Sequence, residues 1–227
     1  MNRKYLGALL GATALALSGV AHAATTISFS SYQITQNPGE AIVTGFETGA
    51  APIALSNVLF SMPGYAITGT ASLLTGSSGL GAAPAMSMTT SDPTQYLSVQ
   101  GGQFANITTP SLMGLSFYVG SLDGYNSVSF THANGTSETF TGAAIDSLFT
   151  SVDANGNQHT GDANGRLTFT FTNAVTGVQL GSSSNSFEIS NFATAVVPEP
   201  ASWALMLVGF GGLGGVLRRR RAVAAVA

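Results

Sequence analysis

The sequence has 227 residues, of which only 7% are charged and 44% are hydrophobic, and it contains no cysteine. The charged fraction is far below the rough quarter that is usual for a soluble domain, and the apolar content argues against a disordered chain. The missing cysteine excludes disulfides, thiol catalysis, iron–sulfur clusters and cysteine-bound zinc.

The charges are divided between the ends and the middle of the chain. Two of the seven basic residues lie near the start, four lie at 218–221, and Arg166 stands alone between them. Residues 24–197 hold nine acidic residues and this one arginine, so their formal charge is −8. Nucleic acid is excluded as a partner of this region, because phosphate contacts require several lysines or arginines.

Residues 1–23 have the pattern of a secretory signal peptide. A basic start precedes an apolar run over 5–20, and the small-x-small site Ala21-His22-Ala23 follows. These are the three parts that signal peptidase recognises. We therefore predict cleavage after Ala23 and export of the rest of the chain, with an uncleaved membrane anchor as the alternative.

Residues 24–193 predict one all-β domain. In several short segments apolar residues alternate with serine or threonine, which is typical of strands half buried in an antiparallel sheet. Asn-Gly and Asp-Gly pairs between the segments indicate tight turns. Such short strands predict an antiparallel β-sandwich or jelly roll of about ten strands. The alternating segments are 27–30, 115–119, 127–130, 167–172 and 187–190.

Three local features refine this prediction. Residues 128–130 and 137–140 flank the Asn134-Gly135 pair, which predicts a hairpin. A short helix is expected near 143–149. Residues 71–91 are rich in Gly, Ser, Ala and Met, and we expect a long loop there.

No familiar catalytic motif is present in the sequence. We find no His-Glu-x-x-His, no Gly-x-Ser-x-Gly, no P-loop and no dinucleotide fingerprint. His132 falls at the predicted hairpin turn, where we expect a solvated side chain. We therefore predict that the protein is not an enzyme. A secreted polysaccharide hydrolase remains an alternative, because its two carboxylates need not stand out among nine acids.

Residues 153–165 contain one ligand-like cluster. Its first three oxygen-bearing residues follow the 1, 3, 5 spacing of a calcium loop. However, Gly156 falls at position 4 rather than 6, and position 12 is not a glutamate. Asx-Gly runs are also ordinary turn residues, so a turn and a calcium site both remain open. The five candidate ligands are Asp153, Asn155, Asn157, Asp162 and Asn164.

Two tyrosines are candidates for stacking on sugar rings. Tyr118 should point away from the apolar face of 115–119, and Tyr125 lies in a turn beside Asp123. The alternatives are that Tyr118 packs under a loop or the opposite sheet and that Tyr125 pins the turn. Trp203, the one tryptophan, lies outside this domain, which counts against strong stacking.

The C-terminal part combines three features. A linker over 194–200 contains a Pro-Glu-Pro motif, and residues 201–217 form an apolar or small-residue run of 17 residues, at the short end of what spans a bilayer. The basic cluster that follows is expected on the cytoplasmic side. We predict a transmembrane helix at 201–217 and a cytoplasmic tail at 218–227. A buried glycine-rich helix and a basic DNA-binding tail are the alternatives.

This C-terminus closely resembles the PEP-CTERM sorting signal, in the variant with Trp-Ala after Pro-Glu-Pro. The resemblance implies export by a Gram-negative bacterium that makes exopolysaccharide, and an inner-membrane stage facing the periplasm. It further implies processing by an exosortase and a final place at the cell surface or in the extracellular matrix. The motif residues are Pro198, Glu199, Pro200, Trp203, Arg218, Arg219, Arg220 and Arg221.

Residues 115–126, 155–158, 166–169 and 183–191 resemble the β-sandwich domain often found ahead of this signal, which is similar in outline to jelly-roll carbohydrate-binding modules. The resemblance implies a structural or carbohydrate-interacting role in exopolysaccharide or biofilm. The expected partners are signal peptidase, exosortase and exopolysaccharide. A calcium-dependent, lectin-like sugar binder is the second hypothesis, and the hydrolase is the third.

Overall fold

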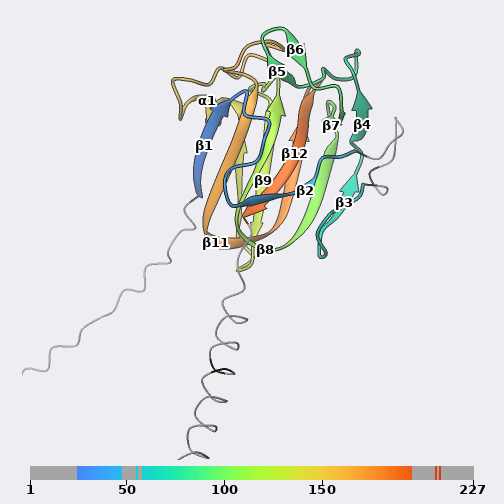
Figure 1. Cartoon of the computed structure of the whole chain (residues 1–227). Helices are drawn as coiled ribbons and strands as arrows, with labels where there is room; N and C mark the ends of the chain where they lie inside the picture. Colours follow the sequence, from blue (N-terminus) through green and yellow to red (C-terminus); the bar gives the residue numbers. More distant parts are fainter. Residues whose placement is uncertain (1–24, 48–54, 56–57, 196–207, 209, 211–227) are drawn as a thin grey trace, which may run out of the picture.

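The computed structural model describes residues 25–47, 55, 58–195, 208 and 210. Within these residues the fold is all-β, as predicted, with twelve strands and one short helix (Figure 1). The strands are β1 (Thr25–Ser31), β2 (Glu40–Thr44), β3 (Ala66–Gly69), β4 (Ser72–Thr75), β5 (Ala85–Ser87), β6 (Thr90–Ser91), β7 (Gln95–Val99), β8 (Phe104–Gly120), β9 (Asn126–His132), β10 (Ser137–Thr141), β11 (Gly165–Ser182) and β12 (Phe187–Ala195), and the helix is α1 (Gly142–Asp146).

The strands form two packed antiparallel sheets, and the two long strands β8 and β11 run through both of them. The start of β8 pairs with the end of β11, and the end of β8 pairs with the start of β11. Between these parts the register shifts twice from Thr170 to Gly177, opposite the stretch of β8 that contains Pro110. Proline donates no ladder hydrogen bond and bulges bend strands, so each long strand passes from one sheet to the other at this point.

The first sheet contains the start of β11 and the end of β8, flanked by β1 on one side and by β12, β7 and β4 on the other, with β2 paired to β12. The second sheet has the order β10, β9, the end of β11, the start of β8, and β3. We call them the first sheet and the second sheet below.

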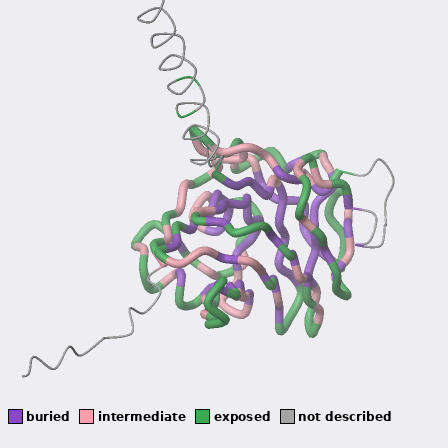
Figure 2. Tube along the Cα trace, turned by 90° about the horizontal axis from the view of Figure 1, so that it is seen from below, coloured by how far each residue is buried: buried purple, intermediate pink, exposed green. Residues whose placement is uncertain are grey.

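Aromatic side chains fill the space between the two sheets. Phe130 of the second sheet meets Phe169 and Phe171 of the first edge-on, with ring centroids 4.9 and 4.8 Å apart. These rings come from the apolar faces of the alternating segments. The predicted half-buried strands are confirmed for 127–130 and 167–172, whereas 115–119 and 187–190 are buried on both faces. Figure 2 shows the buried residues lying along the strands in the interior and exposed residues at the loops.

Loops cover much of the outer face of the first sheet, whereas Thr170 of β11 stays exposed. Ser116 and Tyr118 alternate with core residues along β8 and point away from the core, yet both are fully buried. The Tyr118 hydroxyl donates a hydrogen bond to the carbonyl of Ala85, and Arg166 donates to the connection between β1 and β2. Residues 71–91 are therefore not one long loop as expected: β4 pairs with β7, and the hairpin of β5 and β6 belongs to this cover.

The predicted hairpin is confirmed, and the short helix expected near 143–149 is present at 142–146. Strands β9 and β10 form the hairpin, with Val128 opposite Phe140, and Gly135 takes the left-handed φ of +85° that the turn requires. Helix α1 follows β10 directly, and the Thr141 hydroxyl caps it by accepting from the Ala144 amide at 3.1 Å.

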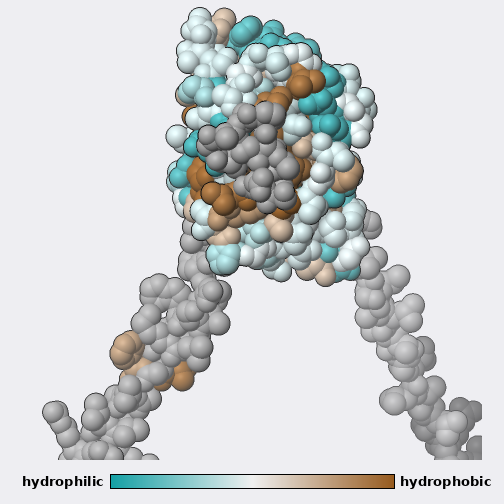
Figure 3. Space-filling view, turned by 90° about the vertical axis from the view of Figure 1, so that its right-hand side faces the viewer, coloured by the Kyte–Doolittle hydropathy of each residue, from teal (hydrophilic) through white to brown (hydrophobic). Residues whose placement is uncertain are grey.

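The predicted signal peptide and C-terminal span lie outside the described residues, apart from Val208 and Phe210, which are helical and exposed. No helix among the described residues has the length and apolar character needed to cross a membrane. On the side of the domain where β3 and β4 lie, apolar side chains form a patch within a mostly polar surface (Figure 3).

Candidate functional site

The outer face of the second sheet is built from uncharged polar side chains. It results from the same alternation that builds the core: Ile107, Phe130 and Val178 point inward, so their chain neighbours point to solvent. The outward side chains that line this face are Asn106 and Thr108 of β8, Ser129 and Thr131 of β9, Ser137 and Thr139 of β10, and Gln179 of β11.

An open groove with a volume of about 410 Å³ runs over this face. Gly177 of β11 lies in its lining and, two residues from Gln179, would direct any side chain outward. A Cβ atom at this glycine would have the Cβ of Thr131 as its nearest neighbour, at 3.6 Å, which is ordinary contact. The packing of the sheet therefore does not require a glycine at position 177, and the absence of a side chain there leaves space in the groove.

Hydrogen bonds orient the polar groups along the groove. The side-chain amide of Gln179 donates to the side-chain oxygen of Asn106 at 2.9 Å, and the hydroxyls of Ser129 and Thr139 lie 2.7 Å apart. The first bond uses one donor of Gln179 and one acceptor position of Asn106, so each amide keeps groups with which to bind a ligand. The lining also includes Ile107 and Val178. We call these two residues, the seven outward side chains and Gly177 the groove.

Arg166, the one arginine between residues 25 and 195, is not part of the groove. Arg166 is fully buried under the loops of the first sheet, where it donates to the carbonyls of Gln33 and Ile34 and to the hydroxyl of Ser116 at 2.9 Å. That hydroxyl in turn donates to Glu40 at 2.6 Å. Burial lowers the pKa of the guanidinium to about 10, against the attraction of Glu40. Arg166 thus holds the connection between β1 and β2 onto the sheet.

Neither candidate tyrosine presents a free ring at the groove. Tyr118 points away from the core as expected but is fully buried beneath the loops, so the expectation of an accessible sugar contact there is wrong, because this part of the outer face of the first sheet is covered. Tyr125 is half-buried and donates to the carbonyl of Asn185 at 2.5 Å. Burial, and the neighbouring carboxylate of Asp123, raise its pKa to about 12. Tyr125 therefore ties its turn to the loop before β12.

The candidate calcium loop forms successive side-chain turns. The side-chain oxygens of Asn155 and Asn157 each accept the amide two residues ahead, both at 2.9 Å, and Asp153 accepts from the Asn155 amide group at 2.7 Å. Within the described residues no three His, Cys, Asp or Glu side chains form a group suited to a metal. One carboxylate oxygen of Asp162 is buried without a hydrogen-bond partner.

Asn164 is not available as a calcium ligand. It is fully buried, and its amide group donates to the carbonyls of Asn157 and Thr160 at 2.7 and 2.9 Å. Its oxygen accepts the backbone amides of Ala85 and Ser121 at 3.2 and 2.9 Å. All four hydrogen-bonding positions of the side chain are used, so Asn164 fixes the loop to the covered face. Calcium binding by the other four residues stays a prediction.

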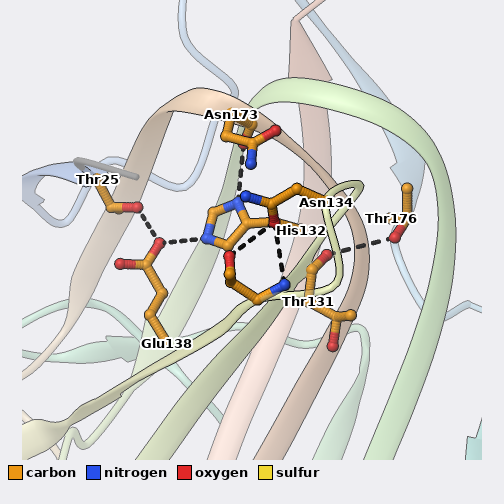
Figure 4. Close-up of polar contacts among 8 residues, drawn as sticks. Thr25, Thr131, His132, Asn134, Glu138, Asn173 and Thr176 are labelled. Atoms are coloured by element: carbon orange, nitrogen blue, oxygen red, sulfur yellow. Dashed lines mark hydrogen bonds and ion pairs between the residues drawn. The ribbon is translucent and has the colours of Figure 1, made fainter. Parts of the chain in front are cut away.

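His132 is buried, not solvated as its position near the turn suggested. Its exposed fraction is 2%, with one ring nitrogen 2.8 Å from the carbonyl oxygen of Asn173 and the other 2.9 Å from Glu138 (Figure 4). The Thr25 hydroxyl contacts the same carboxylate. In a catalytic triad the imidazole lies between hydroxyl and carboxylate, and here the carboxylate lies between them. The cluster connects β1 to β9 and β10.

Sequence reasoning did not single out the groove residues. The alternation that predicts outward Ser, Thr and Asn side chains applies equally to both sheets. Only the position of the loops distinguishes the open face from the covered one. The one local clue is Gly177, a glycine inside a strand, which often marks a close approach of a ligand or another backbone.

The all-β domain is followed by a C-terminal segment that matches a protein-sorting motif. The segment is the PEP-CTERM protein-sorting motif, which matches residues 196–221. The predicted sorting signal is therefore confirmed, and the motif implies processing by an exosortase. No curated protein matches the chain.

The domain is distantly similar in fold to solved β-sandwich structures. One is the CBM22-1 xylan-binding domain of Paenibacillus barcinonensis Xyn10C, with 11% identity over 70% of this chain and 96% of that one, and a TM-score of 0.32. Another is TmCBM61 in complex with β-1,4-galactotriose, with 9% identity over 57% of this chain and 86% of that one, and a TM-score of 0.28. No residue of the groove takes a role from these similarities.

Proposed function

We propose that this protein is an exported, exosortase-processed component of the cell surface or extracellular matrix that binds exopolysaccharide through the groove of the second sheet. The supporting observation is the groove itself, an open face of amides and hydroxyls over four strands. Sugars present hydroxyl donors and acceptors in close succession, and neutral hydrogen-bonding side chains are suited to both. The proposed role requires no catalysis.

Binding by hydrogen bonds without an aromatic platform predicts modest affinity at each site. A polymer with repeated units compensates, because a protein held at the surface or matrix meets many units at high local concentration. This role is consistent with the confirmed sorting motif, since delivery to the surface brings the groove to the polymer.

The test is binding of the full chain, purified in mild detergent, to the exopolysaccharide of the producing organism. We expect saturable binding in calcium that persists in EDTA. Loss of binding in EDTA would favour the lectin-like alternative and the 153–164 loop. Turnover of the polymer, abolished by substitution of one acid or histidine, would favour the hydrolase. Absence of binding in both buffers would refute the carbohydrate role and leave a sorted structural protein.

The sorting step has a separate test. Expressed in a host that has no exosortase, the chain should stay in the membrane fraction, because the predicted 201–217 span is then not removed. A variant that ends at residue 197 should be released in the same host. Release of the complete chain with its tail removed would refute the processing argument.

A further inference from the structure

We infer that the groove binds an uncharged polysaccharide and that acidic exopolysaccharides are not its ligands. The inference rests on the proposed function and adds the charge class of the polymer and the residues that select it. It follows from the chemistry of the groove, from the position of the single arginine, and from the shape that Gly177 leaves.

The groove offers no group that would pair with an anion. Its lining consists of Asn, Gln, Ser and Thr side chains together with Gly177, Ile107 and Val178. A uronate, sulfate or phosphate group placed there would lose part of its hydration without gaining a cation, which is costly for a charged group. A sugar hydroxyl loses far less and recovers a hydrogen bond from the amides or hydroxyls.

The rest of the domain makes an acidic polymer still less favourable. Between residues 25 and 195 there are nine acidic side chains and one Arg or Lys. That one, Arg166, has an exposed fraction of 0% and donates to three carbonyls and a hydroxyl. In the part of the chain that the structure describes, no lysine or arginine is therefore exposed to a ligand, and the negative field of the domain repels polyanions.

The geometry of the face suits an extended chain. The lining residues come from β10, β9, β11 and β8, which are neighbours in that order. Strands lie about 4.8 Å apart, so the four cover about 14 Å, enough for a short oligosaccharide segment. Gly177 lies on β11 beside the Asn106–Gln179 pair, and its missing side chain leaves the space in which a ring would contact both amides.

A second copy of this chain fits the face less well. Interface cores are rich in aromatic and apolar side chains, and the outward side chains of this face are hydroxyls and amides. A polar ligand with many hydroxyls is the better match, and self-association becomes one outcome of the test.

The test measures binding of the full chain in mild detergent to two sets of polymers: uncharged glucans, galactans, mannans and poly-N-acetylglucosamine, and acidic polyuronates and sulfated glycans. Three variants are compared with the wild type. Gly177→Val fills the groove with a residue that suits a strand, and Gln179→Ala removes one amide. Thr170→Val is the matched control, exposed on the same strand but on the outer face of the first sheet.

We expect saturable binding to at least one uncharged polymer and none to the acidic set. Binding should change little with salt, because no ion pair forms. Gly177→Val should weaken it at least about tenfold, Gln179→Ala should weaken it less, and Thr170→Val should leave it unchanged. Unaltered circular dichroism of each variant verifies the fold, and Gln179→Ala remains informative if Gly177→Val misfolds.

Several results would overturn the inference. Saturable, salt-sensitive binding to an acidic polymer alone would refute the charge class while leaving the proposed function intact. Binding to neither set, together with no binding to the native exopolysaccharide, would refute both. Neutral binding unaffected by the two groove variants would place the site elsewhere. Concentration-dependent dimers broken by Gly177→Val would make the face an interface between copies.

Discussion

Phe130 provides the sharpest test of the two-layer architecture behind the groove. It is fully buried on β9, between Ser129 and Thr131, which line the groove. Its ring makes the two shortest ring contacts between the sheets, with Phe169 and Phe171 across the core at 4.9 and 4.8 Å, and Phe140 lies at 6.2 Å on the neighbouring strand. Phe130→Ala removes all of these contacts together.

The magnitude follows from the burial and the ring contacts. Truncation of a buried phenylalanine to alanine costs about 3–5 kcal/mol in free energy of unfolding, and each aromatic pair adds roughly 0.5–1.5 kcal/mol beyond the buried area. Because Phe130 has two close edge-on partners, we expect Phe130→Ala to lower the free energy of unfolding by about 5 kcal/mol. A domain of this kind has a total stability of only about 5–15 kcal/mol, so the variant should be close to unfolding.

Urea unfolding followed by far-UV circular dichroism measures this loss. The matched control is Ser129→Ala, next in the chain but on the solvent side, which should lower the free energy of unfolding by no more than about 1 kcal/mol, because only its hydroxyl contact with Thr139 is lost. A loss below about 1 kcal/mol for Phe130→Ala, or equal losses for both variants, would refute the packing of the second sheet on the first.

Three further predictions concern buried polar groups. Burial raises the pKa of Glu188 above 4.5, so folding takes up a proton near that pH. The free energy of unfolding of the wild type should therefore fall relative to that of Glu188→Gln as the pH rises above 4.5. Parallel pH profiles of this free energy for the two proteins would contradict the prediction. His132→Ala should cost about 2–3 kcal/mol, because Glu138 and the Asn173 carbonyl lose their partner; urea unfolding without change would contradict it. In the same assay Asn164→Ala should lower the free energy of unfolding by about 2–4 kcal/mol. The control Asn157→Ala, at an exposed residue, should lower it by less than about 1 kcal/mol. A smaller loss for Asn164→Ala than for Asn157→Ala would contradict the role of Asn164 as the anchor of the loop.

Much of the secondary structure follows from local pattern. Alternation over 167–172 predicts a strand whose apolar members, Leu167, Phe169 and Phe171, are indeed in the core. Asn134-Gly135 predicts the hairpin because glycine accepts the left-handed conformation of the turn. The lengths of β8 and β11 were not predictable, since the irregular pairing near Pro110 and 172–176 interrupts the alternation within each strand.

The covered and open faces differ only in tertiary structure. Tyr118 and Ser129 have the same local pattern, each next to core phenylalanines, yet one is buried and the other lines the groove. Tyr118 is covered through Ala85, which is 33 positions away, and the loop held by Arg166 comes from residues more than 130 positions away. His132 is buried for the same kind of reason, since Asn173 lies 41 positions along the chain.

The sequence by itself determined the all-β class, the hairpin and the sorting motif over 196–221. Strand alternation and turns depend on neighbouring residues, and a sorting motif is recognised as a linear segment. The tertiary structure decided which hydroxyl-rich face is free, where Arg166 goes, and that Asn164 is an anchor. These properties depend on which distant loop lies over which strand, and burial of a polar group requires partners that only the folded chain brings to it.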